Sequence, residues 1–172
     1  MKVLILFLSF LLPITGKGQC NVKTNRTDDG GTSKEVDYDK IYTNQSENNS
    51  GDSGKGVTIM NGFLVRFDSP GEDPDWGLQV SYYTTKGAVI LPRRLVILFT
   101  NGATLTLDAK ACNPRNQAYI SVFLLTPKNV WELGHPIKSM AVIDYEKAAF
   151  FESNAHYGLY PNVFIDQLKC LQ

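Results

Sequence analysis

The ionisable side chains that could carry out catalysis in this chain are its histidines and carboxylates. His156 follows His135 by 21 residues, so the pair lacks the i, i+4 spacing with which a helix presents two zinc ligands. A hydrolase with two carboxylates would need a shielded acid beside an ionised base. The candidate pairs here are Asp75 with Glu72 and Asp144 with Glu146. Both pairs also fit ordinary surface charge, so the sequence assigns no catalytic residue.

Two short motifs lie in a polar stretch near residue 50. The run Gly51-Asp52-Ser53-Gly54 resembles the nucleophile loop of trypsin-like serine proteases. Lys55 stands where that loop has another glycine, and both histidines follow the serine, whereas that family places its base before it. The pair Gly54-Lys55 does not make a phosphate-binding loop either, because Gly56 replaces the Ser or Thr that holds magnesium. We interpret the stretch as a linker.

A third candidate is a group of acidic residues that precedes Trp76. Carboxylate oxygens at this density could hold calcium, although their spacing differs from a D-x-[DN]-x-[DN]-G loop. Pro70, Gly71 and Pro74 favour a solvated turn instead. The acidic residues of this group are Asp68, Glu72, Asp73 and Asp75. We predict no metal and no cofactor.

Aromatic side chains give the sequence its one indication of ligand binding. Aromatic rings stack on sugar faces and anchor interfaces. Tyr82 and Tyr83 are adjacent in a predicted strand, so their side chains point to opposite faces and at least one should lie outside the main core. The candidate binding residues are Trp76, Tyr82, Tyr83 and Tyr119.

The elements that would position these residues are predicted to be mainly β. From residue 57 onward, short apolar runs alternate with turn residues at intervals of roughly ten, which is typical of an antiparallel sheet or sandwich. We expect seven or eight strands and one or two short helices. The predicted strands are Val57–Phe67, Gly77–Thr84, Arg94–Thr100, Ala103–Asp108, Ala118–Leu125, Ile137–Asp144 and Lys147–Ser153, with a further edge strand at Glu35–Tyr42.

Turn and cap residues add detail to this α+β prediction. Asn101-Gly102 between two apolar runs predicts a two-residue hairpin with a type I′ turn, and a second hairpin is expected at Tyr145 and Glu146. Thr126 before Pro127 predicts a short helix that ends near Gly134. A C-terminal helix from about Pro161 to Leu171 would pack across the sheet through an apolar stripe. The stripe consists of Phe164, Leu168 and Leu171.

The N-terminal residues predict export. An apolar run from Val3 to Ile14 follows Met1-Lys2 and gives way to small and polar residues, as in a secretory signal peptide; it is too short for a transmembrane helix. We expect cleavage after Gln19, and therefore three segments: a signal peptide (1–19), a polar segment with an edge strand (20–56) and a single β-rich domain (57–172). The predicted location is the periplasm, the cell surface or the extracellular space.

Three cysteines in an oxidising compartment predict one disulfide and one free thiol. We expect Cys20 to pair with Cys170, because Cys170 lies on the flank of the C-terminal helix while the polar N-terminal segment is otherwise poorly fixed. In the alternatives, Cys20 carries a lipid anchor, or Cys112 pairs with Cys170. Cys112 falls in the turn-rich stretch from Lys110 to Asn116.

The C-terminal part resembles small exported proteins of uncharacterised function from the Bacteroidetes. The shared pattern is an N-G turn before L-x-L, a short helix opened by L-T, a strand of the type P-I-K-x-M and a final helix ending in L-x-C. The matching residues are Asn101, Gly102, Leu105, Leu107, Leu125, Thr126, Pro136, Ile137, Lys138, Met140, Leu168 and Cys170. The resemblance implies export and fold, and implies no active site.

Charge narrows the classes of partner. The chain has 17 basic and 17 acidic side chains, so it offers no electrostatic footprint for nucleic acid. We therefore predict a non-catalytic binding or structural module with a protein, peptide or glycan ligand. The alternative is a small secreted hydrolase that uses acidic residues or a histidine. A pocket lined by Asp75, Asp144, His135 or His156 would favour the enzyme.

Overall fold

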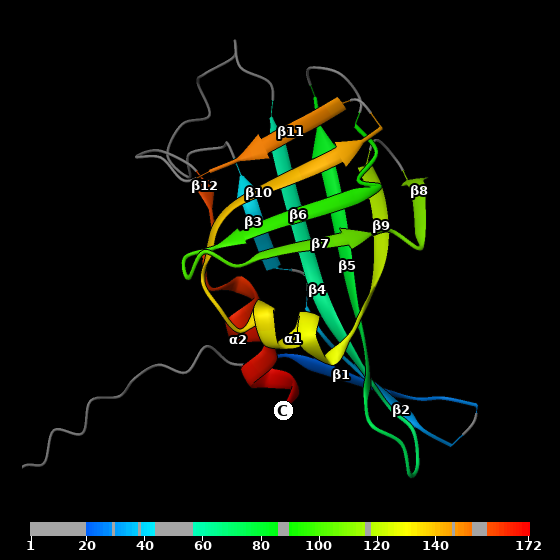
Figure 1. The fold of residues 1–172 in the computed structure, drawn as a ribbon. Helices are drawn as coiled ribbons and strands as arrows, with labels where there is room; N and C mark the ends of the chain where they lie inside the picture. The colour runs from blue at the N-terminus through cyan, green and yellow to red at the C-terminus, as the bar shows by residue number, and fades with distance from the viewer. Residues whose placement is uncertain are drawn as a thin grey trace, which may run out of the picture.

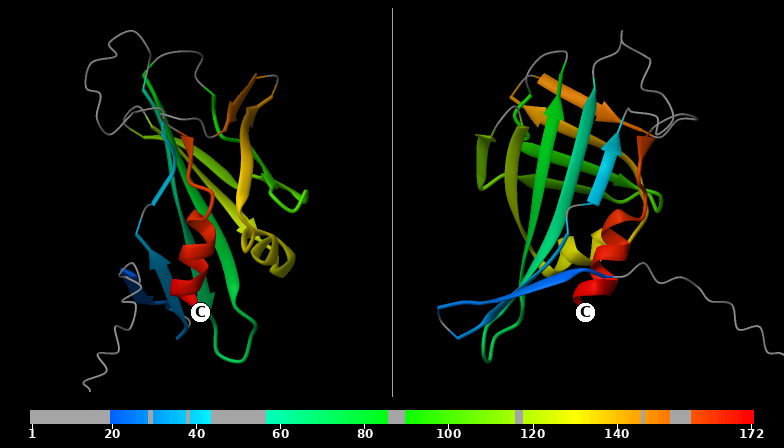
Figure 2. Two further views of the ribbon diagram at one scale, coloured as in Figure 1. Left: turned by 90° about the vertical axis from the view of Figure 1, so that its left-hand side faces the viewer. Right: turned by 180° about the vertical axis from the view of Figure 1, so that it is seen from behind.

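The computed structural model describes residues 20–28, 30–37, 39–43, 57–85, 90–115, 118–145, 147–152 and 158–172. Two antiparallel sheets lie face to face, and their strands cross at a steep angle (Figures 1 and 2). The prediction of a mainly β protein with short helices, including one at the C-terminus, is confirmed. The predicted signal peptide, residues 1–19, lies outside the described residues.

The larger sheet has eight strands, in the order β1-β2-β4-β5-β9-β8, with β3 also paired to β4 and β12 paired to β3. Its long central strands, β4 and β5, pair over ten residues. Its members are β1 (Val22–Arg26), β2 (Thr32–Val36), β3 (Asp39–Thr43), β4 (Thr58–Asp68), β5 (Asp75–Thr84), β8 (Ala111–Arg115), β9 (Ala118–Leu125) and β12 (Gly158–Leu159). The polar N-terminal segment thus contributes three strands to the same sheet.

The smaller sheet covers one end of the larger one, and two helices pack at the other end (Figure 1). Its order is β11-β10-β6-β7, with β6 (Arg94–Phe99), β7 (Thr104–Asp108), β10 (Ile137–Asp144) and β11 (Lys147–Phe151). Helix α1 (Pro127–Leu133) begins at Thr126, whose hydroxyl accepts from the Asn129 amide as an N-cap. Helix α2 (Val163–Leu171) contacts β2, β3 and β4.

The core lies between the two sheets and extends to the helices. Phe99, Phe123 and Phe164 are among its largest fully buried side chains. The predicted stripe on α2 is buried as expected, with Cys170 partly buried on its flank. On the other side of the core, Phe151 contacts the rings of Tyr42 and Tyr82, with centroid distances of 4.8 and 6.0 Å.

Two polar regions differ from their predicted structure. The predicted edge strand Glu35–Tyr42 is divided between β2 and β3, which pair with different halves of β4. The stretch Lys110 to Asn116 was predicted to form turns, but Ala111–Arg115 forms the edge strand β8 on β9. The apolar alternation of the first segment is limited to Val36 and Tyr38, and residues 111–115 have none, so pairing with a neighbouring strand determines the structure of both segments.

The Asn101-Gly102 hairpin is confirmed, but its predicted turn type is wrong. Gly102 has φ +87°, whereas Asn101 is not among the described residues with positive φ. The Gly102 amide donates to Phe99 O (3.0 Å) and the Phe99 amide to Ala103 O (2.9 Å). These bonds define a three-residue loop that ends in a left-handed glycine, in place of a two-residue type I′ turn. At the other hairpin, Tyr145 has φ +52° and Glu146 lies outside the described residues.

Candidate functional site

A groove of about 880 Å³ opens between helix α2 and the junction of β2 with β3. This volume is in the range of small-molecule sites. Both ends of the chain contribute to it, because its walls come from residues 20–40 and 160–170. It is lined by Cys20, Asn21, Val36, Asp37, Asp39, Lys40, Tyr160, Pro161, Asn162, Val163, Asp166, Gln167 and Cys170.

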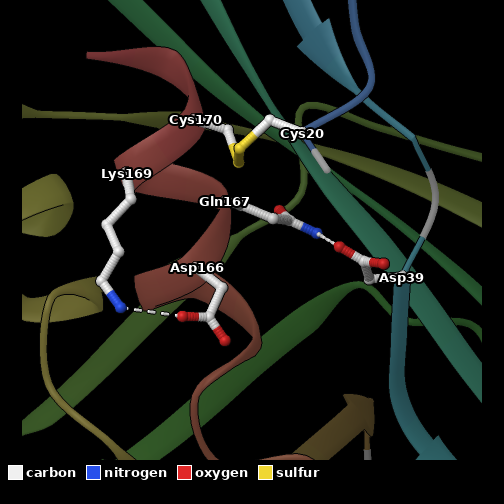
Figure 3. Close-up of a disulfide and its surroundings, with 6 residues drawn as sticks. All are labelled: Cys20, Asp39, Asp166, Gln167, Lys169 and Cys170. Carbon is white, nitrogen blue, oxygen red and sulfur yellow. Dashed lines mark hydrogen bonds and ion pairs between the residues drawn. A yellow bond between two sulfur atoms is a disulfide. The ribbon is translucent and has the colours of Figure 1, made fainter. Parts of the chain in front are cut away.

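The disulfide Cys20–Cys170 joins the two walls of this groove (Figure 3). Its Cα atoms are 5.6 Å apart, within the normal range for a disulfide. The predicted pairing is present, and Cys112 is the free cysteine. The bond fixes the chain just before β1 to α2, and Asn21 and Asp37 line the same groove.

Gln167 forms the buried polar link between the helix and the sheet. Its Oε1 accepts from the Leu64 amide (3.0 Å), and its Nε2 donates to Gly62 O (3.0 Å) and to Asp39 Oδ2 (3.1 Å). Strand β2 pairs with β4 from Val65 onward, and β3 pairs with β4 as far as Gly62. The Gln167 amide therefore takes the place of a strand residue at the gap between β2 and β3, and satisfies backbone groups that would otherwise be buried unpaired.

The carboxylates of the groove are partly neutralised by neighbouring groups. Lys23 Nζ lies 3.1 Å from Asp37 Oδ1, and Asn21 Nδ2 donates to Asp37 Oδ2. The hydrogen bond from Lys23 lowers the pKa of the Asp37 carboxyl and, reciprocally, raises the pKa of Lys23. On the helix, Lys169 Nζ lies 2.9 Å from Asp166 Oδ1 (Figure 3).

This arrangement favours binding over acid–base catalysis. A general acid needs a carboxyl pKa raised by burial or by a like charge, but the pKa of Asp37 is lowered. Asp39, Lys40, Asn162 and the aromatic Tyr160 are all exposed. They present acceptors, donors and one aromatic ring to the same groove.

The four aromatic residues predicted to bind do not form a common surface, and none lines the groove. Tyr82 is buried, and this burial raises the pKa of its phenol. Tyr119 is its cross-strand partner on β9, so both point toward the core. Tyr83 points to the opposite face of the sheet. Trp76, at the far end of β5, is half-buried with the Arg66 guanidinium 5.7 Å from its ring centroid.

The candidate catalytic residues are also scattered. Asp144 accepts hydrogen bonds from Arg93 (3.0 Å) and the Leu91 amide (3.3 Å), and the His135 ring packs edge-on against Trp131 at 4.7 Å. Asp75 is exposed at the start of β5. None of these three lines the groove, and His156 and the Ser53 motif lie outside the described residues.

No group of three His, Cys, Asp or Glu side chains within the described ranges is placed to hold a metal ion. In the acidic loop before Trp76, Asp68 is instead bound to Arg66 (2.6 Å) and lies 3.4 Å from Lys34. The hydrogen bond from Arg66 lowers the pKa of the Asp68 carboxyl. The loop thus directs one of its carboxylates to cations of the protein itself.

Sequence reasoning identified the disulfide of this site but missed Asp39, Lys40, Tyr160 and Gln167. One available signal was Gln167 itself, because it interrupts the apolar side of α2 between Phe164 and Leu168. A glutamine at such a position must find hydrogen-bond partners in the core. Its partners come from segments more than one hundred residues away, which no local pattern could reveal.

Comparisons with protein-family models, with curated protein sequences and with solved structures find no match for this chain. Among the described residues, no helix is long and apolar enough to span a membrane.

Proposed function

We propose that this protein is an exported, non-catalytic binding module that holds a short glycan in the groove beside the Cys20–Cys170 disulfide. The observation that carries the proposal is the groove itself, where an exposed tyrosine lies among mixed hydrogen-bonding groups. Tyr160 supplies a ring for a sugar face. Asp39 accepts from hydroxyl groups, and Lys40 and Asn162 donate to them.

Export is supported by two independent features. The apolar run before Thr15 is typical of a signal peptide. The disulfide joins residues 150 positions apart and holds the groove together, and such structural disulfides persist in oxidising compartments. Cleavage after Gln19 would leave Cys20 as the first residue, already committed to the disulfide through its side chain. A thioether-linked lipid would need that same sulfur, so the disulfide argues against lipidation.

The hydrolase alternative has less support. Asp75, Asp144 and His135 lie away from the groove, and Asp37 within it is held in its ionised form. A binding role needs only that the exposed polar groups meet a ligand of complementary shape.

The test is a titration of the disulfide-intact protein with a panel of soluble oligosaccharides, followed by amide chemical shifts. We expect shifts concentrated at Asn21, Lys40 and Asn162. Tyr160→Ala should weaken binding by about tenfold, equivalent to about 1.4 kcal/mol. Phe150→Ala is the matched control, because Phe150 is also an exposed aromatic residue but lies on β11.

Three outcomes would contradict the proposal. Shifts confined to another surface would move the site elsewhere, and binding of short peptides in place of glycans would change the ligand class. Release of new reducing ends from a bound oligosaccharide would show that the protein is an enzyme.

A further inference from the structure

The free thiol of Cys112 lies at the edge of the larger sheet, away from the groove and its disulfide. Its strand, β8, is the last in the order of that sheet and pairs only with β9 among the described residues (Figure 1). The Cys112 side chain is half-buried, so a small molecule can reach its sulfur from the open side of the strand. This thiol has no part in the groove.

The residue directly opposite Cys112 on β9 is Ser121. Ser121 is fully buried (0% exposed), and its hydroxyl oxygen has no hydrogen-bond partner in the part of the chain that the structure describes. On its other side, Ser121 is paired with Val80 of β5, which is also fully buried, so this row of side chains points into the core. The Cys112 side chain belongs to the same row and points to the same side of the sheet as the Ser121 hydroxyl.

The Ser121 hydroxyl is a group for which the core offers no partner. A buried hydroxyl of this kind is rare in native proteins, because it has lost its hydrogen bonds to water and gained none in return. Val80 has no side-chain acceptor, and the Cys112 sulfur does not accept from the hydroxyl either. Opposite residues on antiparallel strands have Cβ atoms about 4.5–5.5 Å apart. An oxygen atom bound to the Cys112 sulfur can therefore come within hydrogen-bonding distance of Ser121.

We propose that Cys112 is an oxidation site at which hydrogen peroxide forms a sulfenic acid, and that the Ser121 hydroxyl binds the added oxygen. In this step the sulfur attacks one oxygen of the peroxide, so that an S–O bond forms and the O–O bond breaks. The thiol proton leaves with the second oxygen as water. Cys–SH and H₂O₂ thus give Cys–SOH and H₂O, with the sulfur oxidised by two electrons and the peroxide reduced.

The positions of the three cysteines favour a sulfenic acid that persists. A sulfenic acid is normally consumed by a second thiol, which converts it into a disulfide. The other two cysteines, Cys20 and Cys170, are already bonded to each other. Cys20 also precedes β1, the first strand in the order of the larger sheet, whereas β8 is the last. The chain therefore offers Cys112 no thiol with which its sulfenic acid could react.

The burial of Ser121 favours a single added oxygen atom over a larger adduct. Because Ser121 is 0% exposed, a group between the sulfur and the hydroxyl has to be small. A mixed disulfide with a low-molecular-weight thiol would extend through the open edge of β8 and leave the hydroxyl without a partner. A sulfenic acid oxygen satisfies the hydroxyl from within the row.

The test is treatment of the disulfide-intact protein with dilute hydrogen peroxide, without added ligand. Dimedone, which reacts with sulfenic acids, is then added, and peptide mass spectrometry locates the label. We expect the label on Cys112 and no label in a Cys112→Ser variant. Removal of the peroxide with catalase, followed by delayed addition of dimedone, gives the half-life of the sulfenic acid.

Ser121→Ala tests the hydroxyl separately from the thiol. This variant removes an unpartnered group and breaks no hydrogen bond with a described residue, so the fold should be retained. The half-life of the Cys112 sulfenic acid should fall about fivefold, the effect of losing one hydrogen bond. Ser81→Ala is the matched control, because Ser81 lies on β5 between the inward-pointing Val80 and Tyr82 and points to the opposite face. Its half-life should equal that of the native protein.

A second measurement needs no change at Ser121. The oxidised native protein should melt at a higher temperature than its thiol form, because the buried hydroxyl gains a partner. Cys112→Ser treated with the same peroxide is the control for oxidation elsewhere in the chain, and its melting temperature should not rise.

Three results would overturn the proposal. The first is an unlabelled Cys112 at a peroxide dose that labels the urea-unfolded chain. The second is a disulfide of Cys112 with a second copy or with an added small thiol in place of the sulfenic acid. The third is an equal half-life in Ser121→Ala and the native protein. None of these measurements uses a glycan, so their outcome is independent of the function proposed for the groove.

Discussion

The two halves of strand β4 are stabilised by different interactions. Near Thr58, the strand lies under the smaller sheet. Tyr42 and Tyr82, on the two strands beside it, pack against the ring of Phe151. Near Asp68, it is held by a polar and covalent clasp of the Cys20–Cys170 disulfide, Gln167 and Arg66. We call the region around the first half, with the smaller sheet, the sandwich half, and the region around the second half, with β1, β2 and α2, the clasp half.

The difference shows how a polar segment can be built into a β fold. The segment from Cys20 to Thr43 has few apolar side chains, so burial alone contributes little to holding it. The clasp compensates by joining it to α2, whose own apolar stripe is anchored in the core. The groove lies where these two chain ends meet, so the proposed binding site depends on the clasp half.

The largest expected effect is loss of the disulfide in a Cys20→Ser/Cys170→Ser variant. Removing a cross-link between residues 150 positions apart should lower the free energy of unfolding by about 5 kcal/mol in the chain-entropy model. Hydrogen exchange should show lost amide protection in β1, β2 and α2 before β6 and β10. Cys112→Ser is the control with an unchanged disulfide, and equal loss of protection in both sheets would end the distinction between the halves.

The second effect concerns the polar link at Gln167. Gln167→Leu keeps the side-chain volume but leaves the Leu64 amide and Gly62 O without their partner, and should cost about 2–3 kcal/mol. Chemical denaturation measures this loss. Gln172→Leu, at the exposed C-terminal residue, should change stability by less than about 0.5 kcal/mol. Equal stability of the two variants would show that the link contributes nothing.

A smaller effect is expected in the sandwich half at Gly102. Its φ of +87° disfavours a β-branched side chain, and a Cβ there would meet no atom within 4 Å, so the cost comes from the backbone alone. Gly102→Val should destabilise by about 1–2 kcal/mol, and Gly102→Asn by less, because Asn tolerates the left-handed region. Thermal unfolding of both variants gives the comparison. Identical losses would argue against backbone strain as the cause.

The smallest expected effects are changes in stability with pH, which differ between the two halves. The pKa of Asp68 in the clasp half is lowered, so its ionised carboxylate adds to the free energy of unfolding. This stabilisation is present above the unfolded pKa near 3.8 and is lost as the pH falls below it. The pKa of Tyr82 in the sandwich half is raised, so its neutral phenol adds to the free energy of unfolding. This stabilisation is present below the unfolded pKa of about 10 and is lost as the pH rises above it.

Melting temperature against pH for two variants measures these contributions. Asp68→Asn should flatten the acid limb of the profile, and Tyr82→Phe should flatten the alkaline limb. A variant that shifts both limbs together would contradict the assignment of these groups.

Much of the sandwich half was predictable from local pattern. The predicted strands from Val57 to Ser153 have counterparts in β4–β7 and β9–β11, because apolar alternation and turn residues define them locally. The starts of β9 and β10 coincide with the prediction at Ala118 and Ile137. In the clasp half, helix α2 and the disulfide were predictable, but the strands of the N-terminal segment were not. Its strands β1 and β2 carry mostly polar residues, and β2 pairs with β4, whose residues lie 30 to 36 positions away in the sequence.

The sequence by itself determined the β class, the hairpin at Gly102 and both helices, and it favoured the pairing of Cys20 with Cys170 that the structure shows. Each follows from side-chain period, backbone preference or cysteine count, which act over short distances or involve few choices. Only the tertiary structure decided that Gln167 would bridge the gap between β2 and β3, that Tyr82 would be buried while Tyr83 faces outward, and that a groove would form between the chain ends. Those outcomes depend on which strands pair and in which register. A shift of one residue in the register of a strand would turn every side chain of that strand to the opposite face of the sheet.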